Sequence, residues 1–192
     1  MSELIELSRS ALWAMAHPLR FRIWELLREG PATASEVGRR LGESRGSASY
    51  HLRILARAGM IAEDESLGTR RERWWRRPEE PMVGISRGDP EGRILDQRML
   101  AVFFARDEEV RSRYLLGRAS DEWHEASLVV NWFVPMTPAE ADELGLKLFA
   151  LVDELRHRTP PDDAEQTLVS LTILPVLEEG GDPPSTLLHE PP

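Results

Sequence analysis

The stretch from residue 33 to residue 75 constrains the fold more than any other part of the chain. Thr33 and Glu36 have the spacing of a capping box, in which each side chain accepts a hydrogen bond at the start of a helix. Ser44 has the position of an N-cap for a second helix at about residues 45–58. The connection between these two helices is too short for anything but a tight turn, so the sequence predicts a helix-turn-helix.

The residues on either side complete this unit. The spacing of apolar residues and the alternation of β-formers predict helices over residues 3–16 and 18–29, and short strands over residues 60–65 and 72–77. Pro18 separates the first two helices, because proline disfavours helical geometry at the residue before it. Three helices followed by a hairpin form a winged helix-turn-helix.

The second half of the chain predicts a different arrangement. Residues 90–116 read as one long helix, and residues 137–157 as a helix between strands at residues 126–134 and 168–177, which is a small β-α-β unit. The predicted fold class is α+β, mainly α. The predicted domains are a DNA-binding domain (1–78), a linker (79–90), a dimerisation and candidate effector domain (91–178) and a disordered tail (179–192).

Charge is divided unevenly between the halves. The chain has a net charge of −9, yet residues 1–78 carry 14 Arg against 10 acidic residues, a net of +4. Residues 79–192 carry 10 basic and 23 acidic residues, a net of −13. Such asymmetry indicates one domain that faces a polyanion and a second, acidic domain with another task.

Composition excludes several function classes. The chain has no cysteine, so it has neither disulfides nor thiolate metal sites. It also lacks a signal-like N-terminus, a long apolar span and any catalytic or phosphate-binding motif. We therefore expect a cytoplasmic protein that is not an enzyme, has no cofactor and does not enter a membrane.

Two groups of side chains are suited to DNA. Small hydroxyl and arginine side chains on the outer face of the 45–58 helix could read base edges or hold phosphate, and arginines at the hairpin tip could reach the backbone or the minor groove. The alternatives are a solvated helix face and edge protection by charge. The candidate DNA-binding residues are Ser44, Arg45, Ser47, Ser49, Tyr50, Arg53, Thr69, Arg70, Arg71 and Arg73.

Three runs resemble ArsR-type bacterial transcriptional regulators. These are residues 14–23 (AMAHPLRFRI), residues 47–55 (SASYHLRIL) and residues 58–61 (AGMI). The resemblance covers about residues 9–77. It implies a homodimeric winged-helix protein that reads a pseudo-palindromic double-stranded DNA operator. By the same resemblance, the groove-facing positions are Ser44, Arg45, Ser47, Ser49 and Tyr50, and Arg70 and Arg71 lie in the wing. His51 matches a position that the resemblance implies is partly buried, and its expected role is packing.

The chain departs from the best-known members of that family. Those proteins sense metals through cysteine pairs and are short, whereas this chain has no cysteine and continues for more than a hundred residues past the wing. Its signal input must therefore differ. Trp123, Trp132 and Phe133 could line a pocket for a small apolar effector or could simply form core.

Other features also leave alternatives open. The apolar stripe of the 90–116 helix needs a cover, which a second copy or the chain's own C-terminal unit could provide. The pairs Asp121/His124 and Asp153/His157 have the spacing of two metal ligands, but two ligands do not make a site, and surface hydrogen bonding explains them better. A winged-helix protein-interaction module with an acidic C-terminal binding surface is the alternative to a DNA-binding regulator.

Overall fold

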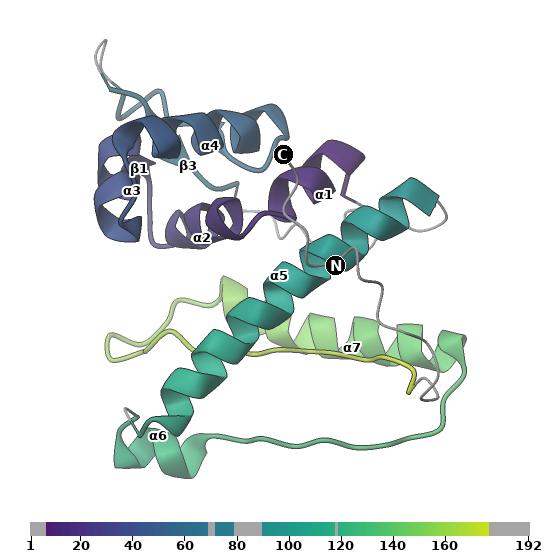
Figure 1. The fold of residues 1–192 in the computed structure, drawn as a ribbon. Helices are drawn as coiled ribbons and strands as arrows, with labels where there is room; N and C mark the ends of the chain where they lie inside the picture. The colour runs from purple at the N-terminus through teal and green to yellow at the C-terminus, as the bar shows by residue number, and fades with distance from the viewer. Residues whose placement is uncertain (1–6, 69–71, 79–89, 118, 177–192) are drawn as a thin grey trace. The chain divides into compact units, whose positions relative to one another are not determined.

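The structure divides into two compact units. The computed structural model describes residues 7–68, 72–78, 90–117 and 119–176. One unit extends to Ala105 and the other begins at Arg106, within helix α5 (Pro90–Leu115) (Figure 1). The predicted linker at residues 79–90, except its last residue, and the predicted tail lie outside the described residues, so the predicted domain limits stay predictions.

The first unit begins with two helices that meet at a proline. Helix α1 (Arg9–Met15) starts where Ser8 Oγ accepts a hydrogen bond from the backbone N–H of Ala11. Helix α2 (Pro18–Leu26) is capped by His17, whose Nδ1 accepts from the N–H of Leu19 at 3.2 Å. The predicted break before Pro18 is confirmed.

The central helix pair also forms as predicted. Helix α3 (Ala34–Leu41) has a complete capping box, in which the Thr33 N–H donates to Glu36 Oε2 at 2.8 Å and the Glu36 N–H donates to Thr33 Oγ1 at 3.3 Å. Helix α4 (Arg45–Arg57) is capped by Ser44. Gly42 ends α3 with a φ of +73°, a conformation that glycine adopts without steric cost.

A close backbone approach sets the turn between these helices. The N–H of Glu43 donates to the carbonyl of Gly38 at 2.8 Å, and a Cβ on Gly38 would stand 2.7 Å from the Glu43 carbonyl oxygen. The turn can therefore fold back onto α3 because residue 38 has no side chain.

A small antiparallel sheet completes the winged helix. Strand β3 (Trp74–Arg76) lies between β1 (Ala32–Thr33) and β2 (Ala62–Glu63), with Ala32 opposite Trp75 and Ala62 opposite Arg76. The two predicted strands are confirmed, although they are shorter than expected. The sequence did not predict β1, because two residues are too few to show an alternating pattern.

The core of this unit is formed by helices α1 to α4, with a contribution from α5. Its fully buried side chains include Leu12, Ile23, Leu52 and Leu55. The first half of the α5 stripe packs on this core through Met99 and Phe103, whose ring lies 4.6 Å from that of Phe21. The winged helix thus covers this part of the stripe, whereas the sequence had suggested a second copy or the C-terminal unit.

The second unit contains helices but no sheet in its described residues. After the end of α5 come α6 (Asp121–Ala126) and α7 (Pro138–His157), the latter with the predicted capping box of Thr137 and Glu140. The predicted strands at residues 126–134 and 168–177 were wrong: α6 takes in residue 126, and residues 127–137 and 164–176 carry no strand pairing. Their β-branched and aromatic content favours extended backbone, but a strand also needs a hydrogen-bonded neighbour.

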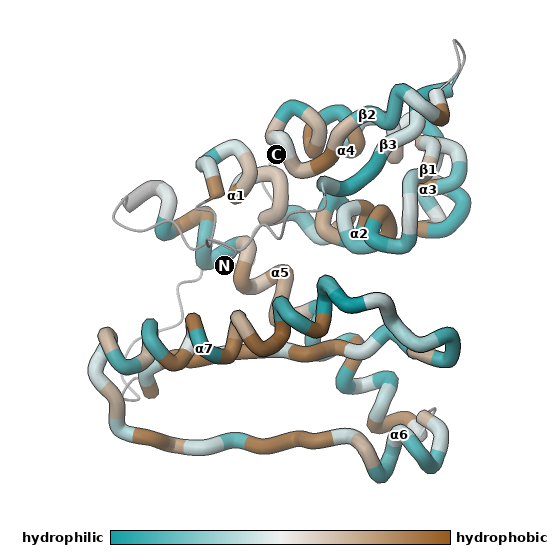
Figure 2. Tube along the Cα trace, turned by 180° about the vertical axis from the view of Figure 1, so that it is seen from behind, coloured by the Kyte–Doolittle hydropathy of each residue, from teal (hydrophilic) through white to brown (hydrophobic). Residues whose placement is uncertain are grey.

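The mainly α, α+β class is confirmed, with the sheet confined to the winged helix. Among the described residues from 106 to 176, none has a buried side chain. Figure 2 shows hydrophobic stretches along both extended segments of this unit. Trp132 and Phe133, expected in a pocket or a core, are 77% and 86% exposed. Over the described residues, no helix is both long and apolar enough to cross a membrane.

The substitution Gly38→Ala should destabilise the first unit by about 1–3 kcal/mol, because the added Cβ forces the Glu43 carbonyl away. Urea unfolding followed by circular dichroism measures the change. Gly46→Ala is the matched control: its Cβ would meet Ser44 Oγ at 3.8 Å, an ordinary contact. That helical substitution should be neutral or stabilising by up to about 1 kcal/mol. Equal effects of both substitutions would contradict the role of Gly38.

Candidate nucleic-acid interface

Helix α4 has one buried face and one polar face. Ala48, Leu52 and Leu55 are buried in the core. Arg45 and Arg53 are exposed and Ser49 is half-buried. These last three residues follow one another at four-residue spacing, so they share one side of the helix.

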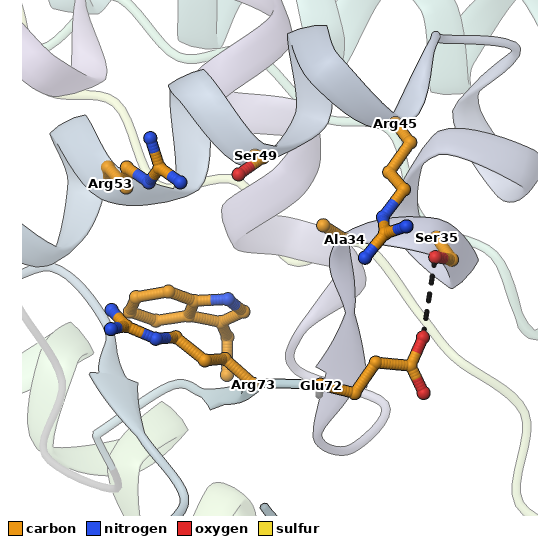
Figure 3. Close-up of a pocket in the computed structure, with 8 residues that line it drawn as sticks. Ala34, Ser35, Arg45, Ser49, Arg53, Glu72 and Arg73 are labelled. Carbon is orange, nitrogen blue, oxygen red and sulfur yellow. Dashed lines mark hydrogen bonds between the residues drawn. The ribbon is translucent and has the colours of Figure 1, made fainter. Parts of the chain in front are cut away.

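A groove of about 190 Å³ runs between this side of α4 and the hairpin. Figure 3 shows Arg45, Ser49 and Arg53 on α4, with Glu72 and Arg73 across from them. The lining residues are Ala34, Ser35, Arg45, Ser49, Arg53, Glu72, Arg73 and Trp75. Three guanidinium groups against one carboxylate give the groove a positive charge.

Ser35 and Glu72, two polar residues of the groove, were not predicted from the sequence. Ser35 Oγ donates to Glu72 Oε1 at 3.5 Å, which is a long hydrogen bond between the start of α3 and the base of the hairpin. Glu72 lies next to the hairpin arginines in the sequence, and this position could have identified it as a residue of the groove. The long-range contact of residues 35 and 72 could not be read from local patterns.

The predicted residues at the N-terminus of α4 are engaged in capping. Ser44 Oγ accepts from the Ser47 N–H at 3.0 Å, and Ser47 Oγ donates to Glu43 Oε2 at 2.9 Å. Tyr50 is 61% exposed and its ring meets that of His51 edge-on, at 5.1 Å. The groove therefore contains Arg45, Ser49 and Arg53 of the predicted helix set, while Ser44, Ser47 and Tyr50 do not line it.

The hairpin turn is held by Asp64. Its Oδ1 accepts hydrogen bonds from the Ser66 hydroxyl at 2.5 Å and from the Ser66 N–H at 3.0 Å. The hydroxyl bond is the largest cause that lowers the pKa of Asp64. Arg73 lies 3.7 Å from Glu63 across the hairpin. The predicted residues Thr69, Arg70 and Arg71 lie outside the described residues.

Behind α4, a buried arginine connects the first two helices. Arg20 Nε donates to the Ala14 carbonyl at 2.5 Å, and one of its terminal nitrogens donates to the Trp13 carbonyl at 2.7 Å. Its guanidinium also lies over the Trp13 ring, 4.4 Å from the centroid. These bonds satisfy carbonyls at the end of α1 that have no helical partner. Burial lowers the pKa of Arg20.

His51 packs next to this arginine, as expected. Its ring is half-buried and lies 4.9 Å from the ring of His17. Burial is the main cause that lowers the pKa of His51, and the charge of Arg20 adds to it, while Glu43 opposes the shift. The neutral imidazole is thus the form that the native structure favours.

The described residues contain no group of three or more potential metal ligands. Of the two pairs considered from sequence, His124 Nδ1 lies 3.3 Å from the Tyr114 hydroxyl, and His157 Nδ1 lies 2.9 Å from the Asp153 carbonyl. Both contacts are surface hydrogen bonds.

Residues 15–64 match the family model of a helix-turn-helix domain. The chain contains a helix-turn-helix domain. The matched segment holds α2, α3 and α4 and falls within the part that resembles ArsR-type regulators, so the predicted helix-turn-helix is confirmed there. Among curated proteins, no match was found.

Several solved structures are similar to the chain. One, a "Possible transcriptional regulator for arsenical resistance", is 27% identical, with 59% of this chain and 100% of that chain covered and a TM-score of 0.33. The adhesin competence repressor of Streptococcus pyogenes is 12% identical (72% and 81% covered, TM-score 0.36). The S. aureus MepR–DNA complex is 13% identical (73% and 77% covered, TM-score 0.30).

The lowered pKa of His51 predicts a loss of stability in mild acid. The unfolded chain binds a proton at this residue near pH 6.5, above the native pKa. The contribution is therefore fully present above pH 6.5 and is lost as pH falls through the native pKa. Urea unfolding between pH 7.5 and 5 measures it. His51→Gln should reduce the loss, whereas His124→Gln, at an exposed position on α6, should retain it. The same pH dependence in both variants would refute the assignment.

Proposed function

We propose that this protein is a sequence-specific DNA-binding transcriptional regulator that acts in the cytoplasm, with α4 in the major groove and the hairpin on the backbone or minor groove. The observation that supports this most strongly is the groove in which Arg45, Arg53 and Arg73 converge beside the second helix of a helix-turn-helix domain. Three guanidinium groups facing one open space suit a polyanion.

The two arginines on α4 suit different tasks. Arg45 stands in the first turn, where the side chains of a recognition helix reach base edges, and a guanidinium can donate two bonds to guanine O6 and N7. Arg53 lies two helical turns further on and, with Arg73 of the hairpin, suits phosphate. Ser49 between them is small and permits close approach to the groove floor.

Glu72 gives this groove a means of rejecting some sequences. Its carboxylate lies opposite the arginines of α4 and can accept a hydrogen bond from cytosine N4, but it repels phosphate. A surface lined with arginine alone would bind any duplex, whereas one carboxylate among three arginines favours a duplex that offers it a donor.

The proposal includes a homodimer on a pseudo-palindromic operator. A recognition helix reads a short half-site, and a two-fold dimer places two such helices about 34 Å apart, one turn of DNA. We place signal input in the second unit, where Trp132 and Phe133 are exposed. Any small apolar effector would bind there, because most of the exposed large apolar side chains among the described residues belong to that unit.

A protein-interaction module remains the second candidate, and the exposed apolar side chains of the acidic second unit favour it. A double substitution distinguishes the two candidate functions. The double variant Arg45→Glu with Arg70→Glu should abolish operator binding and regulation, but it should leave a protein-binding role of the second unit intact.

Replacing Arg45 with alanine should weaken binding to a selected duplex by about 1–3 kcal/mol and relax base preference at one position, since one bidentate contact is lost. Arg53→Ala should weaken all sequences similarly and reduce the salt slope by about one. Fluorescence anisotropy across a salt series measures both effects, with duplexes from the protein's own promoter region.

The matched control is Arg57→Ala, an exposed arginine of the same helix that does not line the groove. It should keep the wild-type affinity within a factor of about two. Binding that is independent of salt, or equal losses for Arg57→Ala and Arg45→Ala, would contradict the proposed DNA-binding face.

A further inference from the structure

Residues 128–134 form an extended, mainly apolar segment that the described residues leave exposed. The segment reads LVVNWFV and carries no charge. It runs between α6 and α7 (Figures 1 and 2), and each of its side chains is exposed. Trp132 and Phe133 leave most of their surface in water, at 77% and 86% exposure. Soluble monomers rarely leave so continuous an apolar surface uncovered.

Both faces of this segment are apolar. Successive side chains of an extended chain point to opposite faces. One face therefore holds Leu128, Val130, Trp132 and Val134, and the other holds Val129, Asn131 and Phe133. A strand with one solvated face would alternate between apolar and polar residues, so this pattern is typical of a strand with neighbours and cover on both faces.

The described part of the chain offers this segment no partner strand. The other extended segment, at residues 164–176, is engaged with helices. Ile173 Cδ1 lies 3.9 Å from the place of a Cβ on Gly145 of α7, and the Ser170 hydroxyl donates to the Asp107 carboxylate on α5. No strand pairing involves residues 128–134 over the described ranges.

We propose that residues 128–134 of two copies pair as antiparallel strands about a two-fold axis at Asn131, and that this pairing is a dimer contact of the second unit. A two-fold contact brings the same patch of both copies together. The segment suits this because it has no charge to repel its own copy. The inference rests on the proposed function in one respect: a regulator that reads two half-sites needs two copies.

The limits of the strand place its centre at Asn131. Before the strand, the Ser127 N–H already donates to the Trp123 carbonyl at 3.0 Å, as the C-cap of α6. After the strand, Pro135 has no N–H to donate. Residues 128–134 remain, and their midpoint is residue 131.

This register matches side chains across the axis. It pairs Leu128 with Val134, Val129 with Phe133, and Val130 with Trp132, so each apolar side chain meets another. The two Asn131 side chains face each other, and an amide can both donate to and accept from an identical amide. A single polar pair in an apolar contact fixes register, because any shift leaves it unpaired.

Cross-strand neighbours are the apolar contacts that this pairing supplies. Aromatic side chains opposite β-branched side chains are stabilising cross-strand pairs. The register sets Val130 against Trp132 and Val129 against Phe133, and the two-fold axis repeats each pair. Four such pairs therefore support the paired backbone.

The lack of native cysteine allows a direct test with the full-length protein. Asn131→Cys places the sole thiol of each chain on the proposed axis. Directly opposed residues of antiparallel strands have Cα atoms about 4.5–5.5 Å apart, within the reach of a disulfide. Mild oxidation should give a covalent dimer on non-reducing electrophoresis, and dithiothreitol should reverse it.

Ser127→Cys is the matched control. In this register the two copies of residue 127 lie eight residues apart along the ribbon, about 27 Å, so no disulfide should form. A monomeric band for Asn131→Cys, or equal cross-linking of both variants, would overturn the proposal. So would a dimer that appears only when Asn131→Cys is mixed with Thr172→Cys, because that result assigns the partner strand to the other extended segment.

A second variant tests the contact without cross-linking. Trp132→Glu places a carboxylate on each strand near the axis and should shift the mass measured by light scattering from two copies to one. Glu122→Lys, an exposed change on α6, should leave the mass unchanged. A dimer that persists in Trp132→Glu would refute the contact, and a circular-dichroism spectrum like that of the wild type would show that this variant is folded.

DNA binding separates this inference from the proposed function. Monomeric Trp132→Glu should lose about 100-fold or more in affinity for two half-sites, while it keeps the weak affinity for one half-site. If Asn131→Cys fails to cross-link but the protein binds operator DNA, only the strand contact is contradicted. If it cross-links but the protein has no affinity for DNA, only the proposed function is contradicted.

Discussion

The turn between α3 and α4 is the constraint on which the candidate interface depends. Gly38 leaves no more than the space of a hydrogen atom beside the Glu43 carbonyl, and the Glu43 N–H bonds back to the Gly38 carbonyl. This turn fixes where Ser44 begins α4. The direction in which a helical side chain points is set by where its helix starts and how its axis runs. The same close approach therefore determines where Arg45 and Arg53 point. The shape of the arginine-lined groove therefore depends on the absence of a side chain at residue 38.

The sequence predicted those parts of the fold that local chemistry decides. The capping boxes at Thr33 and Thr137 and the break at Pro18 depend on residues no more than three positions apart, so their signals lie within a short window. Arg45, Ser49 and Arg53 were also predictable, because helical periodicity separates them from buried neighbours. The contact of Ser35 with Glu72 was not, because it joins residues 37 positions apart.

The prediction of two C-terminal strands was wrong for a related physical reason. Composition correctly indicated extended backbone at residues 128–134, but sheet formation needs a second strand, whose identity no local pattern contains. Apolar content also gave the wrong expectation for Trp132 and Phe133, because an apolar residue is buried only where something covers it. If a second copy covers this segment, as proposed, an inference that treats one copy as the complete folding unit cannot find that cover.

The uneven charge bears on how such a protein finds its site. A net of −13 over residues 79–192 opposes a polyanion, so a duplex bound as proposed would be attracted chiefly through the positive groove of the first unit. The described groove sets one glutamate against three arginines, which would limit the affinity for a duplex that matches only in its phosphates. In the proposed dimer, two copies joined through an uncharged strand would add a second groove without adding charge at the contact. Discrimination would then come from two correct half-sites at once, because one groove alone would hold DNA weakly.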